Sequence, residues 1–196
     1  MFLLFAIVPP QFPDVYYYHI QNIMWNEEFH VVPGLANIEE RFGFNSNLFG
    51  EFVYGINALC MFLVLVYIIR QSKYQKAYLT LLFIAIYVVF FMEYKTHIGC
   101  SSADLLPNLL IVFLLFSLLS NPQNFEKKSL LFWLVPIFCI TLKVSTIFIC
   151  LLSFYLFILF IKKREYRAVT FICTAGLLII FPWLIRNVII SGYLIH

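Results

Sequence analysis

Long apolar runs separated by short polar segments make up most of this amino-acid sequence. A helix needs roughly 20 apolar residues to cross a hydrocarbon core of about 30 Å, so each such run predicts a membrane-spanning helix. The predicted spans cover residues 48–69, 77–92, 105–120, 129–142, 144–161 and 168–185. The pattern therefore predicts an all-α fold, a polytopic transmembrane helical bundle that forms a single membrane domain over residues 1–196.

The apolar run over residues 129–161 is interrupted only by Lys143, so it fits either one long helix or a hairpin of two. Cytoplasmic loops of membrane proteins carry an excess of Lys and Arg. A single helix would place the basic cluster at 162–167 on the opposite side from Lys127 and Lys128, whereas a hairpin places them on the same side. We therefore predict a hairpin that turns at Lys143. Its first arm is about 21 Å long, which places Lys143 below the outer membrane surface.

This orientation separates the charged residues into two groups. Nine of the 13 basic residues fall in the predicted cytoplasmic loops: Arg70, Lys73, Lys76, Lys127, Lys128, Lys162, Lys163, Arg164 and Arg167. Eight of the ten acidic residues fall on the outer side: Asp14, Glu27, Glu28, Glu39, Glu40, Glu51, Glu93 and Asp104. The sequence thus predicts polar chemistry on the outer face, and the basic loops account for the net charge of +3 without a nucleic-acid partner.

The composition agrees with an integral, multi-pass membrane protein. Hydrophobic residues make up 63% and charged residues 12% of the chain, with a mean hydropathy of +0.92, against about 25% charged residues in soluble domains. The five cysteines have no CxxC spacing, and no GxxxxGK[ST], HExxH or GxSxG pattern occurs. These absences disfavour metal clusters, nucleotide hydrolysis, zinc proteolysis and serine hydrolysis. No cofactor or metal ligand is predicted, and a divalent metal stays open.

Polar residues concentrate in an N-terminal outer loop over residues 9–47. Within it, Asp14, Tyr18, Gln21 and Trp25 recur at three- and four-residue spacing, which predicts an interfacial amphipathic helix over residues 14–29. The apolar stub 1–8 is too short to cross a bilayer and is typical of the end of a preceding helix. We therefore expect a fragment of a longer protein.

Several short sequences carry a resemblance to a known class of enzymes. They are Pro9-Pro10, Asp14, Tyr18-His19, Trp25, Val32–Asn37, Arg41–Ser46, Pro182–Asn187 and Ser191-Gly192-Tyr193. With them, almost the whole chain resembles bacterial polytopic glycosyltransferases of the GT-C class, close to the Rgt-like and protein-mannosyltransferase-like branches. Proteins of that class are longer than this chain.

The resemblance implies an enzyme of the bacterial inner membrane that assembles cell-surface glycans. It would take a sugar from a polyprenyl-phosphate donor and transfer it to a glycan or lipid acceptor on the outer side. Asp14 matches the catalytic base, Lys143 and Arg186 match cations near the lipid phosphate, and Tyr18 and His19 would help to bind substrate. The residues fit this chemistry on their own, because transfer to a hydroxyl needs a carboxylate base and a cation that stabilises the departing phosphate.

Each candidate also has a structural interpretation. Asp14 fits a helix cap, Tyr18 an interfacial aromatic belt, Lys143 a lysine that reaches the headgroups, and Arg186 a lipid-headgroup anchor. Three functional classes stay open: the glycosyltransferase, a noncatalytic membrane subunit or truncated remnant, and a transporter of lipid-linked saccharides. The transporter is disfavoured because the predicted spans are nearly free of ionisable residues and show no inverted repeat.

Overall fold

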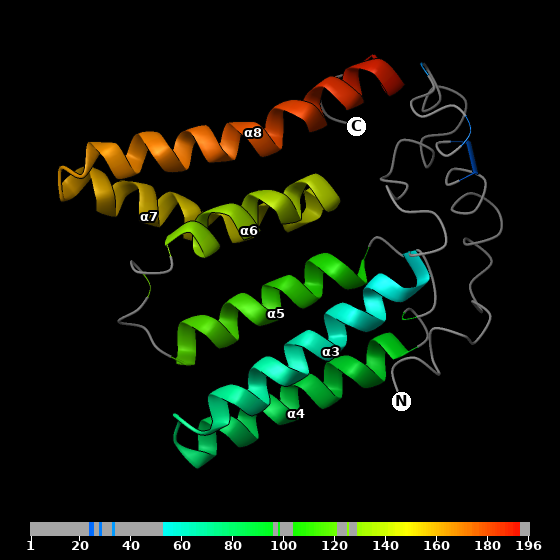
Figure 1. Ribbon diagram of the computed structural model, residues 1–196, viewed down its shortest axis with the longest axis vertical. Helices are drawn as coiled ribbons and strands as arrows, with labels where there is room; N and C mark the ends of the chain where they lie inside the picture. Colours follow the sequence, from blue (N-terminus) through cyan, green and yellow to red (C-terminus); the bar gives the residue numbers. More distant parts are fainter. Residues whose placement is uncertain are drawn as a thin grey trace.

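The computed structural model describes residues 53–95, 104–120 and 129–192, together with Met24, Trp25, Glu28, Pro33, Ile98 and Phe125. Over the three continuous ranges, every regular element is a helix (Figure 1). The helices are α3 (Val53–Ser72), α4 (Ala77–Tyr94), α5 (Leu105–Ser120), α6 (Ser129–Leu142), the 3-10 helix η7 (Val144–Ile149), α7 (Cys150–Lys162) and α8 (Tyr166–Ser191). The predicted stub 1–8 lies outside the described residues, and so do the predicted outer loop and its interfacial helix apart from four single residues.

Each predicted span overlaps a helix of the structure. The bounds of α5 and α6 coincide with the predicted ranges 105–120 and 129–142. The second arm of the hairpin differs, because its first six residues form the 3-10 helix η7 before α7 begins at Cys150. Lys143 separates the two arms, and α6 packs along both η7 and α7.

The last span is longer than predicted. The sequence predicted that this span ends at residue 185, but α8 continues through Pro182 to Ser191. A proline removes one backbone donor from a helix, but transmembrane helices tolerate proline because neighbouring groups satisfy the freed backbone. The helix ends instead at Gly192, which has a left-handed φ of 80°. A glycine with positive φ just after the last helical residue is a common helix terminator.

Among the described residues, three helical segments are long and apolar enough to cross a membrane: Ala77–Tyr94, Val144–Lys162 and Tyr166–Ile190. Three shorter apolar helices, Asn57–Ser72, Leu105–Ser120 and Ser129–Leu142, accompany them. Many large apolar side chains on these helices face outwards, for example Leu178 at 72% exposure and Val89 at 70%. Such a surface is unsuited to water and suited to lipid, which indicates a membrane protein.

Helix α5 lies between two groups of packed side chains. On one side, Leu105, Leu109 and Phe116 belong to a core shared with α3 and α4. On the other side, Leu114 packs into a core shared with α6, α7 and α8. The first core also contains a buried hydrogen bond of 2.9 Å from the Tyr87 hydroxyl to the Met61 carbonyl, which joins α4 to α3. Helix α5 therefore joins the two halves of the bundle.

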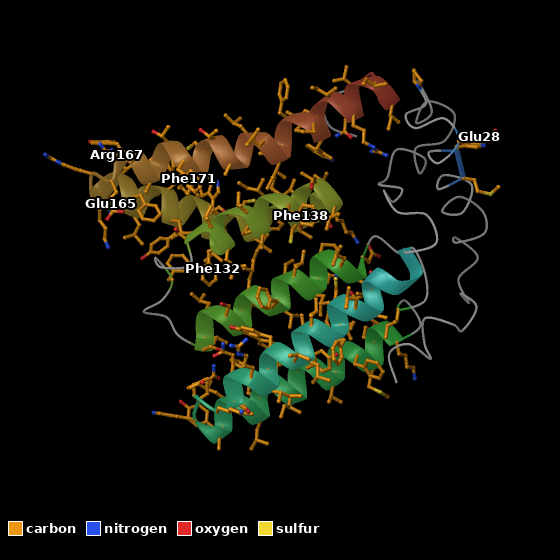
Figure 2. All side chains as sticks on the ribbon, in the orientation of Figure 1. Glu28, Phe132, Phe138, Glu165, Arg167 and Phe171 are labelled. Carbon is orange, nitrogen blue, oxygen red and sulfur yellow. The ribbon has the colours of Figure 1, made fainter. Side chains whose placement is uncertain are left out.

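The two ends of the bundle differ in charge. The α3–α4 and α7–α8 turns lie at the same end (Figure 1). These turns and the adjoining helix ends carry Arg70, Lys73, Lys76, Lys162, Lys163, Arg164 and Arg167. We call this the basic end. Figure 2 shows Glu165 and Arg167 there, and Glu28 far from them at the other end. The starts of α3 and α5 and the ends of α4, α6 and α8 also lie at that other end, called here the Lys143 end (Figure 1).

Candidate functional site

Lys143 is held at its position by backbone hydrogen bonds on both sides. Its conformation is extended, with φ −153° and ψ 112°, between α6 and η7. The Lys143 N–H donates to the Cys139 carbonyl at 2.9 Å. The Lys143 carbonyl accepts bonds from the Thr146 N–H at 3.0 Å and from the Thr146 hydroxyl at 2.7 Å. These bonds therefore fix the position of the Lys143 Cα, from which the side chain extends.

The Lys143 ammonium forms an ion pair with the Asp104 carboxylate, donating from Nζ to Oδ1. Asp104 directly precedes α5, so the pair connects the start of α5 to the break between α6 and η7. Neither side chain is sealed off, since their exposed fractions are 36% for Lys143 and 45% for Asp104. The pair is thus both fixed in place and accessible from outside the protein.

Both partners lie where short helices end. Helices α5 and α6 have 16 and 14 residues, which correspond to about 24 Å and about 21 Å at 1.5 Å per residue. The hydrocarbon core is about 30 Å thick, and α3 with 20 residues matches it. If the basic-end termini of all three helices lie at the same depth in that interface, the Lys143–Asp104 pair lies several ångströms below the opposite surface. A charge at that depth is costly unless it is paired, and the ion pair satisfies this requirement.

Further polar contacts surround the pair. Asn108 lies one helical turn after Asp104, and its Nδ2 donates to the Tyr94 hydroxyl at 2.7 Å. Tyr94, in turn, stacks on Phe90 with ring centroids 4.5 Å apart. On the α6 side, the Cys139 thiol lies 3.9 Å from the Pro107 carbonyl, within the range of a weak sulfur hydrogen bond. These contacts join α4, α5 and α6 at the Lys143 end.

The predicted site residues are only partly brought together. Asp14, Tyr18 and His19 lie outside the described residues. Arg186 is half-buried in α8, next to the buried Asn187, rather than beyond the end of the span as predicted. Arg186 lies in the C-terminal part of α8, which ends on the same side of the bundle as Lys143 (Figure 1).

The sequence placed Asp104 among the acidic residues of the outer side but did not single it out for this role. The pairing with Lys143 spans 39 residues, and no local pattern indicates it. The sequence does contain one indication of the pair. Asp104 and Lys143 have opposite charges and border apolar helices whose predicted ends lie on the same side of the membrane. A buried or half-buried lysine at such a helix end needs an anionic partner.

Among the residues that the structure describes, no group of three or more His, Cys, Asp or Glu side chains could hold a metal ion. Cys60, Cys139, Cys150 and Cys173 are free thiols. A shallow open hollow on the surface of α8 lies at the opposite, basic end and is lined by Tyr166, Arg167, Thr170, Phe171 and Thr174. The Lys143–Asp104 pair is therefore the strongest candidate site in the described part of the chain.

Comparison with known proteins gives one match. The family model described as "Domain of unknown function (DUF8201)" matches residues 1–196. No curated protein and no solved structure matches the chain.

Proposed function

We propose that this chain, which belongs to the DUF8201 family, is a membrane glycosyltransferase. It moves a sugar from a polyprenyl-phosphate-linked donor to a glycan or lipid acceptor at the outer face of the bacterial inner membrane. In this proposal the six helical segments form a multi-pass bundle, and the predicted N-terminal outer loop is on the same side of the membrane as the Lys143 end. The basic end faces the cytoplasm, in keeping with the excess of Lys and Arg on that side of membrane proteins.

The observation that carries the proposal is the position of the Lys143 ammonium. It lies at the end opposite the basic cluster, it is partly exposed, and its side chain is paired with a carboxylate rather than extended alone towards the headgroups. A polyprenyl-phosphate donor keeps its lipid in the hydrocarbon core and its phosphate at the membrane surface. An exposed cation at the end of a short helix suits such a phosphate, since charge-assisted hydrogen bonds to phosphate are among the stronger ones.

The chemistry needs two roles from the protein. The acceptor hydroxyl attacks the anomeric carbon of the sugar, the bond from that carbon to the phosphate oxygen breaks, and the phosphate leaves with the electron pair. Asp14 takes the proton of the acceptor hydroxyl, while Lys143 stabilises the negative charge that develops on the departing phosphate. Arg186 is the second candidate cation, and Tyr18 and His19 contribute to binding the acceptor.

The test is sugar transfer by the chain in membranes of its source cells, which supply the native acceptors. The probes are polyprenyl-phosphate-linked glucose, mannose and arabinose, each radiolabelled and used in turn. We expect the wild-type chain to transfer one of these sugars, and we expect Asp14→Asn and Lys143→Ala to lose at least about 100-fold in rate, as removal of a general base or of a charge-stabilising group commonly does.

Glu165→Gln is the matched control, because it removes a carboxylate at the basic end, far from the site. It should transfer sugar at the wild-type rate, and all variants should insert into the membrane in similar amounts. Absence of transfer by the wild-type chain with every donor would refute the proposal. Wild-type turnover by Asp14→Asn would refute the assignment of the base.

A further inference from the structure

We infer that Asp104 is the positioning residue of the phosphate site: its carboxylate holds the Lys143 ammonium where the donor phosphate binds. This inference rests on the proposed function and adds to it a residue that the resemblance does not supply. It starts from the ion pair between the two side chains at the Lys143 end.

A lysine below the membrane surface has a simple alternative to such a site. Its long flexible side chain can extend towards the headgroups and place the ammonium in water. The Lys143 backbone is fixed between α6 and η7, so the direction of the side chain decides where the charge lies. Asp104 draws the ammonium sideways to the start of α5, which keeps it near the ends of the two short helices.

The geometry leaves the ammonium able to bind a second anion. A lysine ammonium has three N–H donors, and the pair uses Oδ1 of Asp104 as acceptor for one of them. With 36% of its side chain exposed, Lys143 has room to offer further donors to phosphate oxygens. In the absence of the donor the pair is electrically neutral, which lowers the cost of placing the charge at this depth.

Contacts other than the ion pair also hold α5 in place at this point. Leu105 and Leu109 of α5 are 0% and 1% exposed in the core shared with α3 and α4. Asn108 bonds to Tyr94, and Cys139 contacts the Pro107 carbonyl. Partly exposed ion pairs contribute little to stability, and an unpaired Lys143 can extend its ammonium to the headgroups, so loss of the Asp104 charge should leave the bundle intact. A functional effect can therefore be separated from a structural one.

The experiment measures steady-state kinetics and thermal unfolding of the purified chain in lipid vesicles, with the labelled donor that the wild type uses. The variants are Asp104→Asn, which removes the charge, and Asp104→Glu, which restores it on a longer side chain. We expect Asp104→Asn to raise the KM for the donor about tenfold, which corresponds to the free energy of one lost charge-assisted hydrogen bond. The KM for the acceptor and the unfolding temperature should not change. Asp104→Glu should recover part of the donor affinity.

Glu165→Gln serves again as the control for the loss of one acidic charge, and it should change neither KM. A donor KM in Asp104→Asn equal to that of the wild type would overturn the inference and leave the glycosyltransferase assignment standing. A parallel change in both KM values and in the unfolding temperature would also overturn it, because it would assign Asp104 a structural role. If the wild-type chain transfers no sugar, the proposed function fails and the inference fails with it.

Discussion

Ser153 on α7 supplies the hydrogen bond that Pro136 cannot donate within α6. In a helix, the N–H of residue 136 would bond to the carbonyl of Phe132, but proline has no N–H. The Ser153 hydroxyl lies 3.2 Å from that carbonyl and 3.1 Å from the Trp133 carbonyl, so its single proton is shared between them. In a bilayer no water is available to satisfy a freed carbonyl. The Ser153 hydroxyl of α7 thus satisfies the carbonyl that Pro136 leaves without a donor in α6.

Ser153→Ala should destabilise the bundle by about 1 kcal/mol, because it leaves the Phe132 carbonyl without this donor. The measurement is unfolding of the purified chain in mixed micelles by increasing denaturing detergent. The effect should shrink when Pro136 is replaced by alanine, since residue 136 then donates to the same carbonyl. Ser72→Ala is the control, because its hydroxyl bonds to the Ile69 carbonyl at an exposed helix end. Equal losses in the presence and absence of Pro136 would contradict this account.

Gly176 sets how closely α8 packs against α6. A Cβ at this position would lie 3.0 Å from Trp133 Nε1 and 3.1 Å from Ile137 Cδ1. In Gly176→Ala, the higher helix propensity of alanine, about 1 kcal/mol over glycine, offsets the cost of this crowding. We therefore expect little net change in the free energy of unfolding. Gly176→Leu adds bulk that the core cannot accept and should cost about 1–3 kcal/mol.

The same unfolding assay tests the Gly176 variants, with Thr174→Leu as the control. Thr174 is exposed on α8 and its hydroxyl bonds only to its own helix, at 2.9 Å from the Thr170 carbonyl. Thr174→Leu should therefore unfold at the same detergent concentration as the wild-type chain. If Gly176→Leu is as stable as Thr174→Leu, the two helices pack less closely at this point than the structure indicates.

Arg164 ends α7 in a conformation that suits glycine. Its φ is 58°, its N–H donates to the Ile161 carbonyl, and the next N–H donates to the Phe160 carbonyl, each at 3.0 Å. This pair of bonds is the Schellman motif, in which glycine is the usual left-handed residue. Arg164→Gly should therefore stabilise the chain by about 1 kcal/mol in thermal unfolding. Arg164→Val should destabilise it, and a stabilised valine variant would show that the left-handed turn is absent.

The charge difference between the two ends predicts the orientation of the chain. In a background in which the five native cysteines are replaced by alanine, Lys95→Cys should react with a membrane-impermeant maleimide in intact cells. Lys73→Cys should react only after the cells are permeabilised. Both positions are exposed, and they lie at opposite ends of α4 and its preceding turn. Labelling of Lys73→Cys from outside would reverse the assignment of the faces.

The sequence was most informative where apolar runs have polar borders. Helices α5 and α6 start and end where such runs do, because the segment embedded in lipid ends where the apolar residues end. It was less informative at the end of the last span, because α8 continues beyond residue 185 to Ser191 and transmembrane helices tolerate an internal proline such as Pro182. The Lys143–Asp104 pair depends on how α5 packs against α6, and this long-range relationship has no local signature. The predicted base Asp14 lies outside the described residues.

Helices of unequal length have a consequence for the surrounding lipid. Helix α8 has 26 residues and α6 has 14, or about 39 Å and about 21 Å. This hydrophobic mismatch is relieved when a long helix tilts and the bilayer thins around the short ones. Thinning beside α5 and α6 lowers the headgroup layer towards Lys143. If the donor binds as proposed, the acyl-chain length of the host membrane thereby helps to set the distance between its phosphate and the Lys143 ammonium.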